Sequence, residues 1–234
     1  MDIKGKKAVV FGGTSGIGLA VTQQLAARGA TVVAVSRDPS KVGELPAGVT
    51  TMACDVLDRE AVAGVLAACA PYDILVSSAT GGDRAIGRFT EMDMDGFQGS
   101  FRKVWGYANV VRYGTEHLPE DGTIVLVSGS PARRIKPGMI AVGAAGAAIE
   151  SMVRSIAQEI KPRRINVVAP GVIDTPMNPL QGEARTKAYA ANTANHLIPR
   201  AGTAEECAQA VLFLLENEFV TGTTIDVDGG WLQA

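Results

Sequence analysis

The sequence of 234 residues has little of what several protein classes require. Its three cysteines, Cys54, Cys69 and Cys207, are odd in number and scattered, which argues against a disulfide framework, and their spacing matches no metal site. Aromatic residues make up only 5% of the chain, the net charge is −2, and no basic stripe indicates nucleic-acid binding. No apolar run reaches the roughly 20 residues that a membrane helix needs.

The N-terminus also lacks the features of a signal peptide. The stretch MDIKGKKAVVFGG is charged and then passes directly into an apolar run, without a long apolar region or a small-residue cleavage site. We therefore expect a cytoplasmic protein that acts on a small molecule and has no metal, nucleic-acid or membrane partner.

What the sequence does have is an alternation of short apolar runs with segments of helical periodicity. Because the runs are mostly apolar throughout, they are typical of strands in a parallel sheet that is covered on both faces. Such alternation predicts an α/β fold with a doubly wound sheet. Seven strands are expected, at about 6–13, 30–38, 48–56, 73–80, 122–130, 163–171 and 223–230. Helices are expected between them, at about 17–29, 58–69, 94–117, 138–159 and 203–217.

No linker, repeat or low-complexity segment interrupts this pattern, so a single domain from 1 to 234 is expected. The one irregular insertion is about 177–199, which contains Tyr189 and His196. A connection that long is often a lid or a substrate loop. A helical excursion on the surface is the alternative.

The first turn, FGGTSGIG at 11–18, follows a strand and opens a helix, which is the context of a dinucleotide site. Its glycines allow the backbone to approach a pyrophosphate, and the helix N-terminus offers free N–H groups and positive potential. At the end of the second strand, Ser36 and Arg37 stand where a carboxylate would bind the ribose of NAD. A hydroxyl and a guanidinium suit a 2′-phosphate, so NADP(H) is favoured, although Arg37 as a solvated surface charge remains open.

Together these motifs resemble the single-domain short-chain dehydrogenase/reductase family over nearly the whole chain. GGTSGIG resembles the cofactor-binding turn of that family. CDV at 54–56 resembles the stretch with its adenine-binding acidic residue. SSATGG at 77–82 occupies the place of its Asn-Asn-Ala-Gly stretch. RRINVVAPGVIDTP at 163–176 resembles the family's segment that packs against the nicotinamide. Residues 219–230 resemble the family's C-terminal strand. The resemblance implies a Rossmann-like three-layer sandwich, with a seven-stranded parallel sheet flanked by helices. It assigns the cofactor to Gly12, Thr14, Ser15, Gly16, Ile17, Gly18, Ser36, Arg37, Asp55, Val56, Ser78, Ala79, Thr80, Pro170, Gly171, Val172 and Thr175.

The catalytic positions of that family are changed in this chain. The family uses an Asn, a Ser, a Tyr and a Lys, and the register of AAIESMVRSIAQEI puts Val142 at the Tyr position and Gly146 at the Lys position. The Ser position falls on Gly129, between Ser128 and Ser130, and the Asn position falls on Lys103. We expect the small residues of AVGAAGAAIE at 141–150 either to allow a close approach or to leave a space beside the nicotinamide.

Loss of the Tyr removes the usual proton donor but not hydride transfer, because general acid help is worth roughly 10²–10⁴ in rate. Lys103 is the first candidate for a replacement, since desolvation near a cationic ring lowers a lysine pKa. A lysine on a solvated face of the helix is the alternative. Ser128 or Ser130 could hold the substrate oxygen. Less favoured are an anion site at Arg133, Arg134 and Lys136, and acids delivered by Tyr189 or His196.

Two classes of function are compatible with these residues. The first is an NADP(H)-dependent oxidoreductase that reduces a carbonyl or similar group with a non-standard site. The second is a cofactor-binding homologue without the redox step, such as a regulatory or partner subunit, an isomerase or a dehydratase. The intact cofactor motifs favour the first. The resemblance also implies a homo-oligomer, a tetramer or a dimer.

Overall fold

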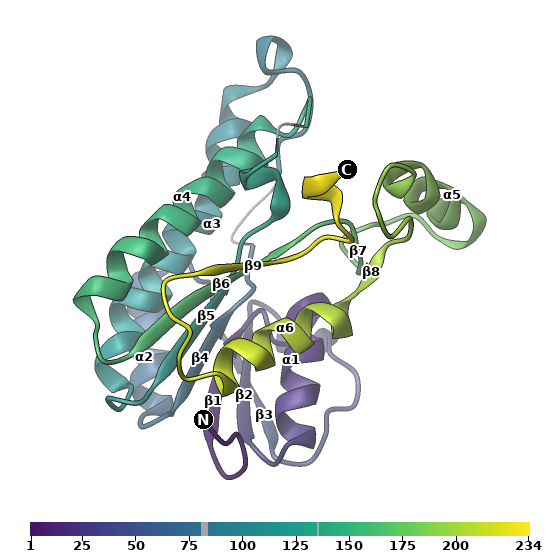
Figure 1. Ribbon diagram of the computed structural model, residues 1–234. Coiled ribbons are helices and arrows are strands. Elements are labelled where there is room, and N and C mark those ends of the chain that lie inside the picture. The colour runs from purple at the N-terminus through teal and green to yellow at the C-terminus, as the bar shows by residue number, and fades with distance from the viewer. Residues whose placement is uncertain (81–83, 135) are drawn as a thin grey trace.

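The computed structural model describes residues 1–80, 84–134 and 136–234. Gly81 and Gly82, at the end of the predicted stretch 77–82, lie outside the described residues. The centre of the fold is a parallel sheet with the strand order β3-β2-β1-β4-β5-β6-β9 (Figure 1). Its strands are β1 (Lys7–Phe11), β2 (Thr31–Ser36), β3 (Val49–Ala53), β4 (Ile74–Ser77), β5 (Thr123–Val127), β6 (Arg164–Pro170) and β9 (Thr224–Val227).

Helices cover both faces of this sheet and make a three-layer sandwich (Figure 1). One face carries α1 (Gly16–Ala27) and α6 (Ala204–Glu216); the other carries α2 (Arg59–Cys69), α3 (Met94–Gly114) and α4 (Ile140–Glu159). Helix α6 begins with a capping box, in which Thr203 accepts from the N–H of Glu206. The predicted Rossmann-like fold with seven parallel strands is confirmed.

The core is divided into two layers by the sheet because neighbouring residues of a strand point to opposite faces. In β5, Ile124 and Leu126 pack toward α2, α3 and α4, whereas Val125 packs toward α1 and α6. All five residues of β5 are buried, which explains its continuous apolar run. The same alternation directs the side chain of Ser128, just beyond the strand, toward the face that carries α3 and α4.

The insertion at 177–199 forms an arm that projects from the body of the domain (Figure 1). Its main element is α5 (Gly182–Thr193), and the arm is joined to the body by a two-stranded parallel sheet of β7 (Ile173–Asp174) and β8 (Gly202–Thr203). Neither short strand was expected from the sequence, because two residues give no periodicity to detect. The helical alternative for this segment is therefore correct for its secondary structure.

Helix α4 is long and apolar enough to pass for a membrane span by composition alone. Its buried residues include Ala141, Ile149 and Val153, which pack within the domain. Ile149 and Val153 belong to the core layer under α2 and α3. The hydropathy of α4 is thus accounted for by packing against the sheet.

Candidate active site

The turn after β1 has the tight geometry that a dinucleotide site requires. Gly12 has a φ of 78°, and a Cβ on Gly18 would lie 2.1 Å from the carbonyl oxygen of Gly12 and 2.4 Å from Ser78 Oγ. Only glycine fits such approaches. The turn therefore delivers the free N–H groups at the start of α1 to the carboxyl edge of the sheet, where they favour an anion.

Residues that follow two other strands lie against this turn. A Cβ on Gly12 would be 2.9 Å from the backbone nitrogen of Ala79, and one on Gly16 would be 3.5 Å from Thr175 Cβ. Ser78 is hydrogen-bonded through its backbone N–H to Phe11 at the end of β1. The structure therefore brings together the predicted cofactor residues that follow β1, β4 and β6.

The end of β2 presents a hydroxyl and a guanidinium without a competing carboxylate. Ser36 Oγ is buried and has no hydrogen-bond partner among the described residues, and Arg37 is exposed. Asp38 is occupied in its own turn, where it accepts from the N–H and the hydroxyl of Ser40 and pairs with Lys41 at 3.1 Å. The arrangement matches the sequence expectation for a phosphate-bearing ribose.

The remaining predicted cofactor residues line the same edge with varied exposure. Asp55 is exposed and accepts from the N–H of Leu57 at 3.0 Å, whereas Val56 is buried against Gly106 of α3. Pro170 ends β6 in the core, and the N–H of Gly171 donates to Val227 at 3.0 Å. Asp55 thus stays accessible to a ligand, while Val56 and Pro170 set the shape of the edge.

Lys103 belongs to α3, and its side chain reaches the end of β5. Its Nζ donates to the carbonyl oxygen of Ser128 at 3.1 Å and lies 5.5 Å from the centre of the Tyr107 ring. Burial, helped by repulsion from the nearby Arg84 guanidinium, lowers the pKa of Lys103 to about 7. An amine with that pKa exchanges protons readily at neutral pH.

Both candidate serines use their only proton inside the protein. Ser128 Oγ donates to Glu150 Oε1 at 2.9 Å, and the fully buried Ser130 Oγ donates to the carbonyl oxygen of Ala169 at 3.2 Å. A serine hydroxyl has one donor, so each is left with acceptor capacity only, whereas the Lys103 ammonium has more donors than its single bond uses. Of the three predicted catalytic residues, Lys103 alone keeps a proton to give.

The small residues of 141–150 allow a close approach between two segments. A short 3-10 helix, η4 (Ser130–Ala132), packs on α4 so closely that a Cβ on Gly143 would lie 2.6 Å from the Pro131 carbonyl oxygen. A Cβ on Gly146 would lie 3.1 Å from Ala132 Cβ. The expectation of an open space at the emptied Lys position is therefore corrected, because η4 fills it.

Sequence reasoning missed Glu150, the acid at the end of that stretch. Its carboxylate is 5% exposed, accepts from Ser128 Oγ, and lies 3.3 Å from Arg133 Nε. Arg133 also forms a bidentate pair with Asp226 of β9. Burial raises the pKa of Glu150, against the hydrogen bond from Ser128. A charged residue on the buried face of an otherwise apolar helix was the available signal.

The contacts of Arg133, Tyr189 and His196 bear on the less favoured candidates for an anion site and for a proton donor. Arg133 binds the chain's own carboxylates rather than a free anion. Tyr189 donates its hydroxyl proton to Asp174 Oδ1 at 3.2 Å, so that proton is engaged on the arm. His196 is buried, and burial lowers its pKa, so it is neutral at pH 7.

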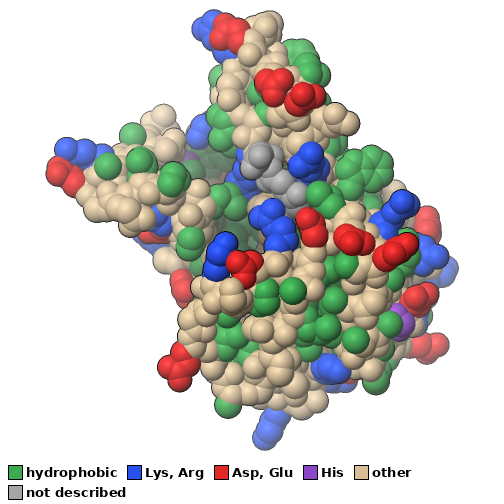
Figure 2. Space-filling model, turned by 180° about the vertical axis from the view of Figure 1, so that it is seen from behind, with side chains coloured by type: hydrophobic (Ala, Val, Ile, Leu, Met, Phe, Trp, Pro, Cys, Tyr) green, Lys and Arg blue, Asp and Glu red, His purple; other side chains and the backbone are tan. Residues whose placement is uncertain are grey.

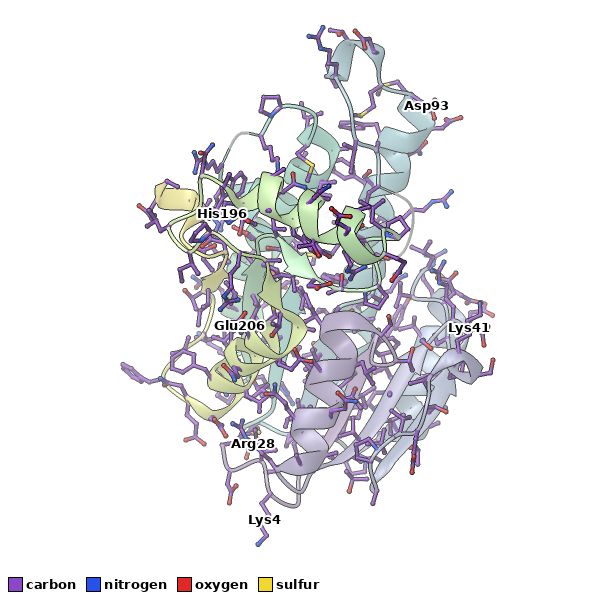
Figure 3. The ribbon with its side chains drawn as sticks, turned by 90° about the vertical axis from the view of Figure 1, so that its right-hand side faces the viewer. Lys4, Arg28, Lys41, Asp93, His196 and Glu206 are labelled. Carbon is purple, nitrogen blue, oxygen red and sulfur yellow. The ribbon has the colours of Figure 1, made fainter. Side chains whose placement is uncertain are left out.

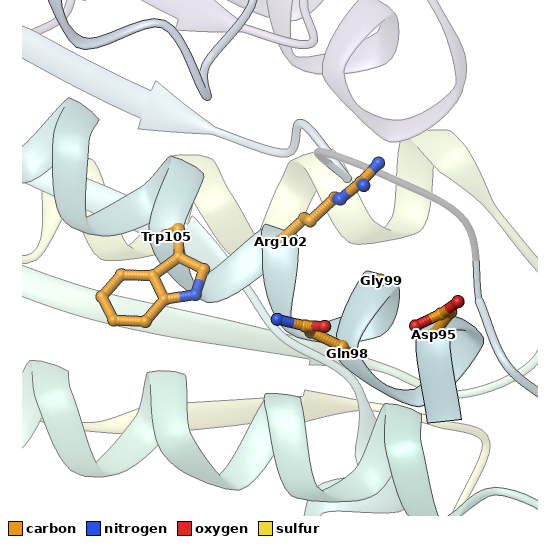
Figure 4. Close-up of a pocket in the computed structure, with 5 residues that line it drawn as sticks. All are labelled: Asp95, Gln98, Gly99, Arg102 and Trp105. Atoms are coloured by element: carbon orange, nitrogen blue, oxygen red, sulfur yellow. The ribbon is translucent and has the colours of Figure 1, made fainter. Parts of the chain in front are cut away.

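Two hollows on the surface lie away from these residues. One of about 470 Å³ is on the outer side of α3, lined by Asp95, Gln98, Gly99, Arg102 and Trp105 (Figure 4). Another lies between the outer sides of α3 and α4, and includes Val111, Met152 and Ile156. Lys103 lines neither of them, so neither hollow is the reaction site.

Comparison with known proteins agrees with this geometry. A family model described as enoyl-(acyl carrier protein) reductase matches residues 12–232. The chain belongs to the short-chain dehydrogenase/reductase family. It is 32% identical to the cyclic-di-GMP-binding biofilm dispersal mediator protein of Escherichia coli, over 97% of both chains. It is 35% identical to a 3-oxoacyl-[acyl-carrier-protein] reductase of Thermotoga maritima, over 98% of this chain and 99% of the relative.

A solved structure gives the same result for the fold of this short-chain dehydrogenase/reductase. A small-chain dehydrogenase in complex with NADPH superposes with a TM-score of 0.86, at 27% identity, over 99% of this chain and 100% of the other. The placement of Val142 and Gly146 at the family's Tyr and Lys positions stays a prediction from the sequence register; in the structure, η4 packs against Gly146.

The close contacts of Gly18 in the turn after β1 predict that two Gly→Ala substitutions have opposite effects on the free energy of unfolding. Gly18→Ala places a Cβ against the Gly12 carbonyl oxygen and is expected to destabilise the protein by about 1–3 kcal/mol. Gly64→Ala on α2 meets nothing within 4 Å and should stabilise by roughly 0.5–1 kcal/mol. Urea unfolding of both variants measures the difference, and equal stabilities would contradict the packing described.

The Glu150 network gives a second stability prediction. Glu150→Ala leaves Ser128 Oγ without its acceptor and Arg133 without one carboxylate, so we expect a loss of about 1–3 kcal/mol in urea unfolding. Glu159→Ala, an exposed site on the same helix, is the control and should change stability by less than about 0.5 kcal/mol. A Glu150 variant as stable as the control would show that the network contributes nothing.

Proposed function

We propose that this protein is an NADP(H)-dependent oxidoreductase that reduces a carbonyl or similar group by hydride transfer, with Lys103 as the proton donor. The observation that carries the proposal is the position of Lys103 Nζ, at 3.1 Å from the Ser128 carbonyl oxygen, on the edge where the cofactor motifs converge. Its relatives include reductases over nearly their whole length, which supports this class of reaction.

The cofactor assignment rests on the residues after β2. Ser36 Oγ is a buried hydroxyl without a partner among the described residues, and Arg37 is an exposed cation beside it. A 2′-phosphate would satisfy both, and the turn from Gly12 to Gly18 would hold the pyrophosphate. A neighbouring structure that contains NADPH supports the same choice.

NADPH, when held by the turn from Gly12 to Gly18 and by Ser36 and Arg37, would supply a hydride for the carbonyl carbon. The carbonyl oxygen gains the electron pair of its π bond and takes one proton from the Lys103 ammonium, which becomes a neutral amine. Ser128 and Ser130 donate to Glu150 and Ala169, so they orient the edge rather than protonate the substrate. Lys103 recovers its proton from water because it is only half-buried.

A second candidate function is a cofactor-binding homologue without the redox step. Val142 and Gly146 favour it, since the family's usual proton donor is absent, and one relative is described as a cyclic-di-GMP-binding mediator. The two functions separate in one assay that follows NADPH absorbance and fluorescence with ketones, quinones and imines. Tight binding without oxidation would favour the second, and no binding would exclude both.

We also propose a single 234-residue domain that acts in the cytoplasm as a homo-oligomer, on a small molecule. The groove between α3 and α4, with Val111, Met152 and Ile156, supports association through that face. The arm at 177–199 is proposed to shape the substrate pocket.

The lowered pKa of Lys103 predicts a pH profile with a definite sign. Carbonyl reduction needs the ammonium, so kcat should fall as pH rises through about 7, and alcohol oxidation should rise over the same range. Lys103→Met should reduce the rate of reduction by about 10²–10⁴ and abolish that titration. Steady-state rates between pH 5.5 and 9 measure it, with Lys161→Met as control. Unchanged turnover in Lys103→Met would remove Lys103 as donor.

The cofactor preference has its own prediction. Arg37→Ala removes the cation beside Ser36 and should raise KM for NADPH by on the order of 10-fold, because a charge-assisted hydrogen bond is lost. KM for NADH should stay nearly constant, since NADH has no 2′-phosphate. Lys4→Ala, at the far end of the molecule (Figure 3), is the charge-matched control. Equal effects on both cofactors would argue that Arg37 is a surface charge only.

A further inference from the structure

Three segments that are far apart in the sequence meet at the side chain of Trp231. The Arg134 guanidinium lies 5.3 Å from the centre of the Trp231 ring and donates to the Trp231 carbonyl oxygen. Lys136 Nζ lies 6.0 Å from the same ring, and the ring of His196 is 6.3 Å away. Two cations, an indole and an imidazole from the loop after η4, the C-terminal segment and the arm therefore form one cluster.

The cluster stands at the carboxyl edge of the sheet. Arg134 and Lys136 follow η4, which follows β5, and Trp231 begins η5 (Trp231–Gln233), which follows β9. His196 lies on the arm beside the C-terminal ribbon (Figure 3). From behind, the molecule is hollowed between the arm and the body, and Lys and Arg side chains lie around the hollow (Figure 2).

The carboxylates near this cluster are occupied elsewhere. Asp226 pairs with Arg133, and Asp174 pairs with Arg185. Asp228 caps its own turn, where it accepts from two backbone N–H groups of the C-terminal segment. Among the described residues, no carboxylate lies within ion-pair distance of Arg134 or Lys136. Burial is the largest cause that lowers the pKa of His196; Asp228 raises that pKa, and Lys136 and Arg134 lower it.

The cluster lies near one edge of the sheet, and the predicted sites for the phosphates of the cofactor lie toward the other edge. β9 is the edge strand next to β6, whereas Arg37 follows β2 near the opposite edge, and the glycine turn follows β1. Ligands in such sheets lie across the carboxyl ends of the strands. A cofactor whose phosphates are at β1 and β2 leaves the β5–β9 end of the crevice to the substrate.

We propose that Arg134, Lys136 and Trp231 bind an anionic oxygen group of the substrate, a carboxylate or a phosphate, next to a flat apolar part that packs on the indole. This inference rests on the proposed function and names its substrate class. A guanidinium provides the directed donors, the ammonium adds charge, and the ring provides an apolar wall. The neutral His196 behind the ring adds no competing charge.

A matched pair of carbonyl compounds tests this proposal. Phenylglyoxylate carries a carboxylate beside its ketone, and methyl phenylglyoxylate is its neutral ester. In the double variant Arg134→Gln/Lys136→Gln, KM for the acid should rise by on the order of 10-fold or more, because charge-assisted hydrogen bonds are lost. KM for the ester and for NADPH should change less than about 2-fold.

The control removes two exposed cations at other places, Lys4→Gln/Arg59→Gln, and should leave KM for the acid and for the ester unaffected. Equal increases in KM for the acid and the ester in the Arg134/Lys136 variant would overturn the proposal. A rise in KM for NADPH would also overturn it, since the two cations would then belong to the cofactor site.

A binding measurement keeps the inference separate from the redox proposal. Calorimetry of phenylglyoxylate with the cofactor-free protein should give saturable heat in the wild type and none in the double variant, whose fold is checked by circular dichroism. No heat in the wild type, or heat retained in the variant, would overturn the anion site. Binding without any NADPH oxidation would uphold the site and exclude only the proposed reduction.

Discussion

The candidate site is organised by the contact between η4 and α4, where the Pro131 carbonyl oxygen lies so close that Gly143 has no room for a side chain. This contact fixes the path of the chain after β5 and thereby the position of Ser128. Ser128 in turn receives Lys103 at its carbonyl oxygen and gives its hydroxyl proton to Glu150. A larger residue at Gly143 would push η4 away and separate these groups.

Charge is balanced differently on the two sides of this contact. On the α4 side, the buried Glu150 carboxylate and Asp226 share the guanidinium of Arg133, so one cation is paired with two carboxylates. On the α3 side, Lys103 has a carbonyl oxygen and no carboxylate partner among the described residues, and burial together with Arg84 disfavours its charged form. A half-buried cation in such surroundings gives up its proton easily, which is the property that a donor near neutral pH needs.

The same edge extends to Trp231, where Arg134 and Lys136 lie against the indole. In sequence these cations stand next to Arg133, and the three together form one candidate anion site. The fold divides them, because Arg133 turns to Glu150 and Asp226 while Arg134 turns to Trp231. Which cations are available to a ligand therefore depends on which carboxylates the tertiary structure brings near, and no local pattern contains that information.

The sequence by itself determined the sheet, the helices and the cofactor turn. Apolar runs such as that of β5 are local, and the steric demand for Gly12 and Gly18 is set within one turn. It also placed Lys103 on the helix of residues 94–117, but it left open whether that side chain points into the site or into solvent. Only the tertiary structure decided that η4 fills the place beside Gly146 and that Glu150 is a buried acid. It also decided that the hydroxyl protons of Ser128 and Ser130 are both used in hydrogen bonds within the protein. These properties arise from contacts between β5, η4, α4 and β6, whose distances depend on packing rather than on the residues of any one segment.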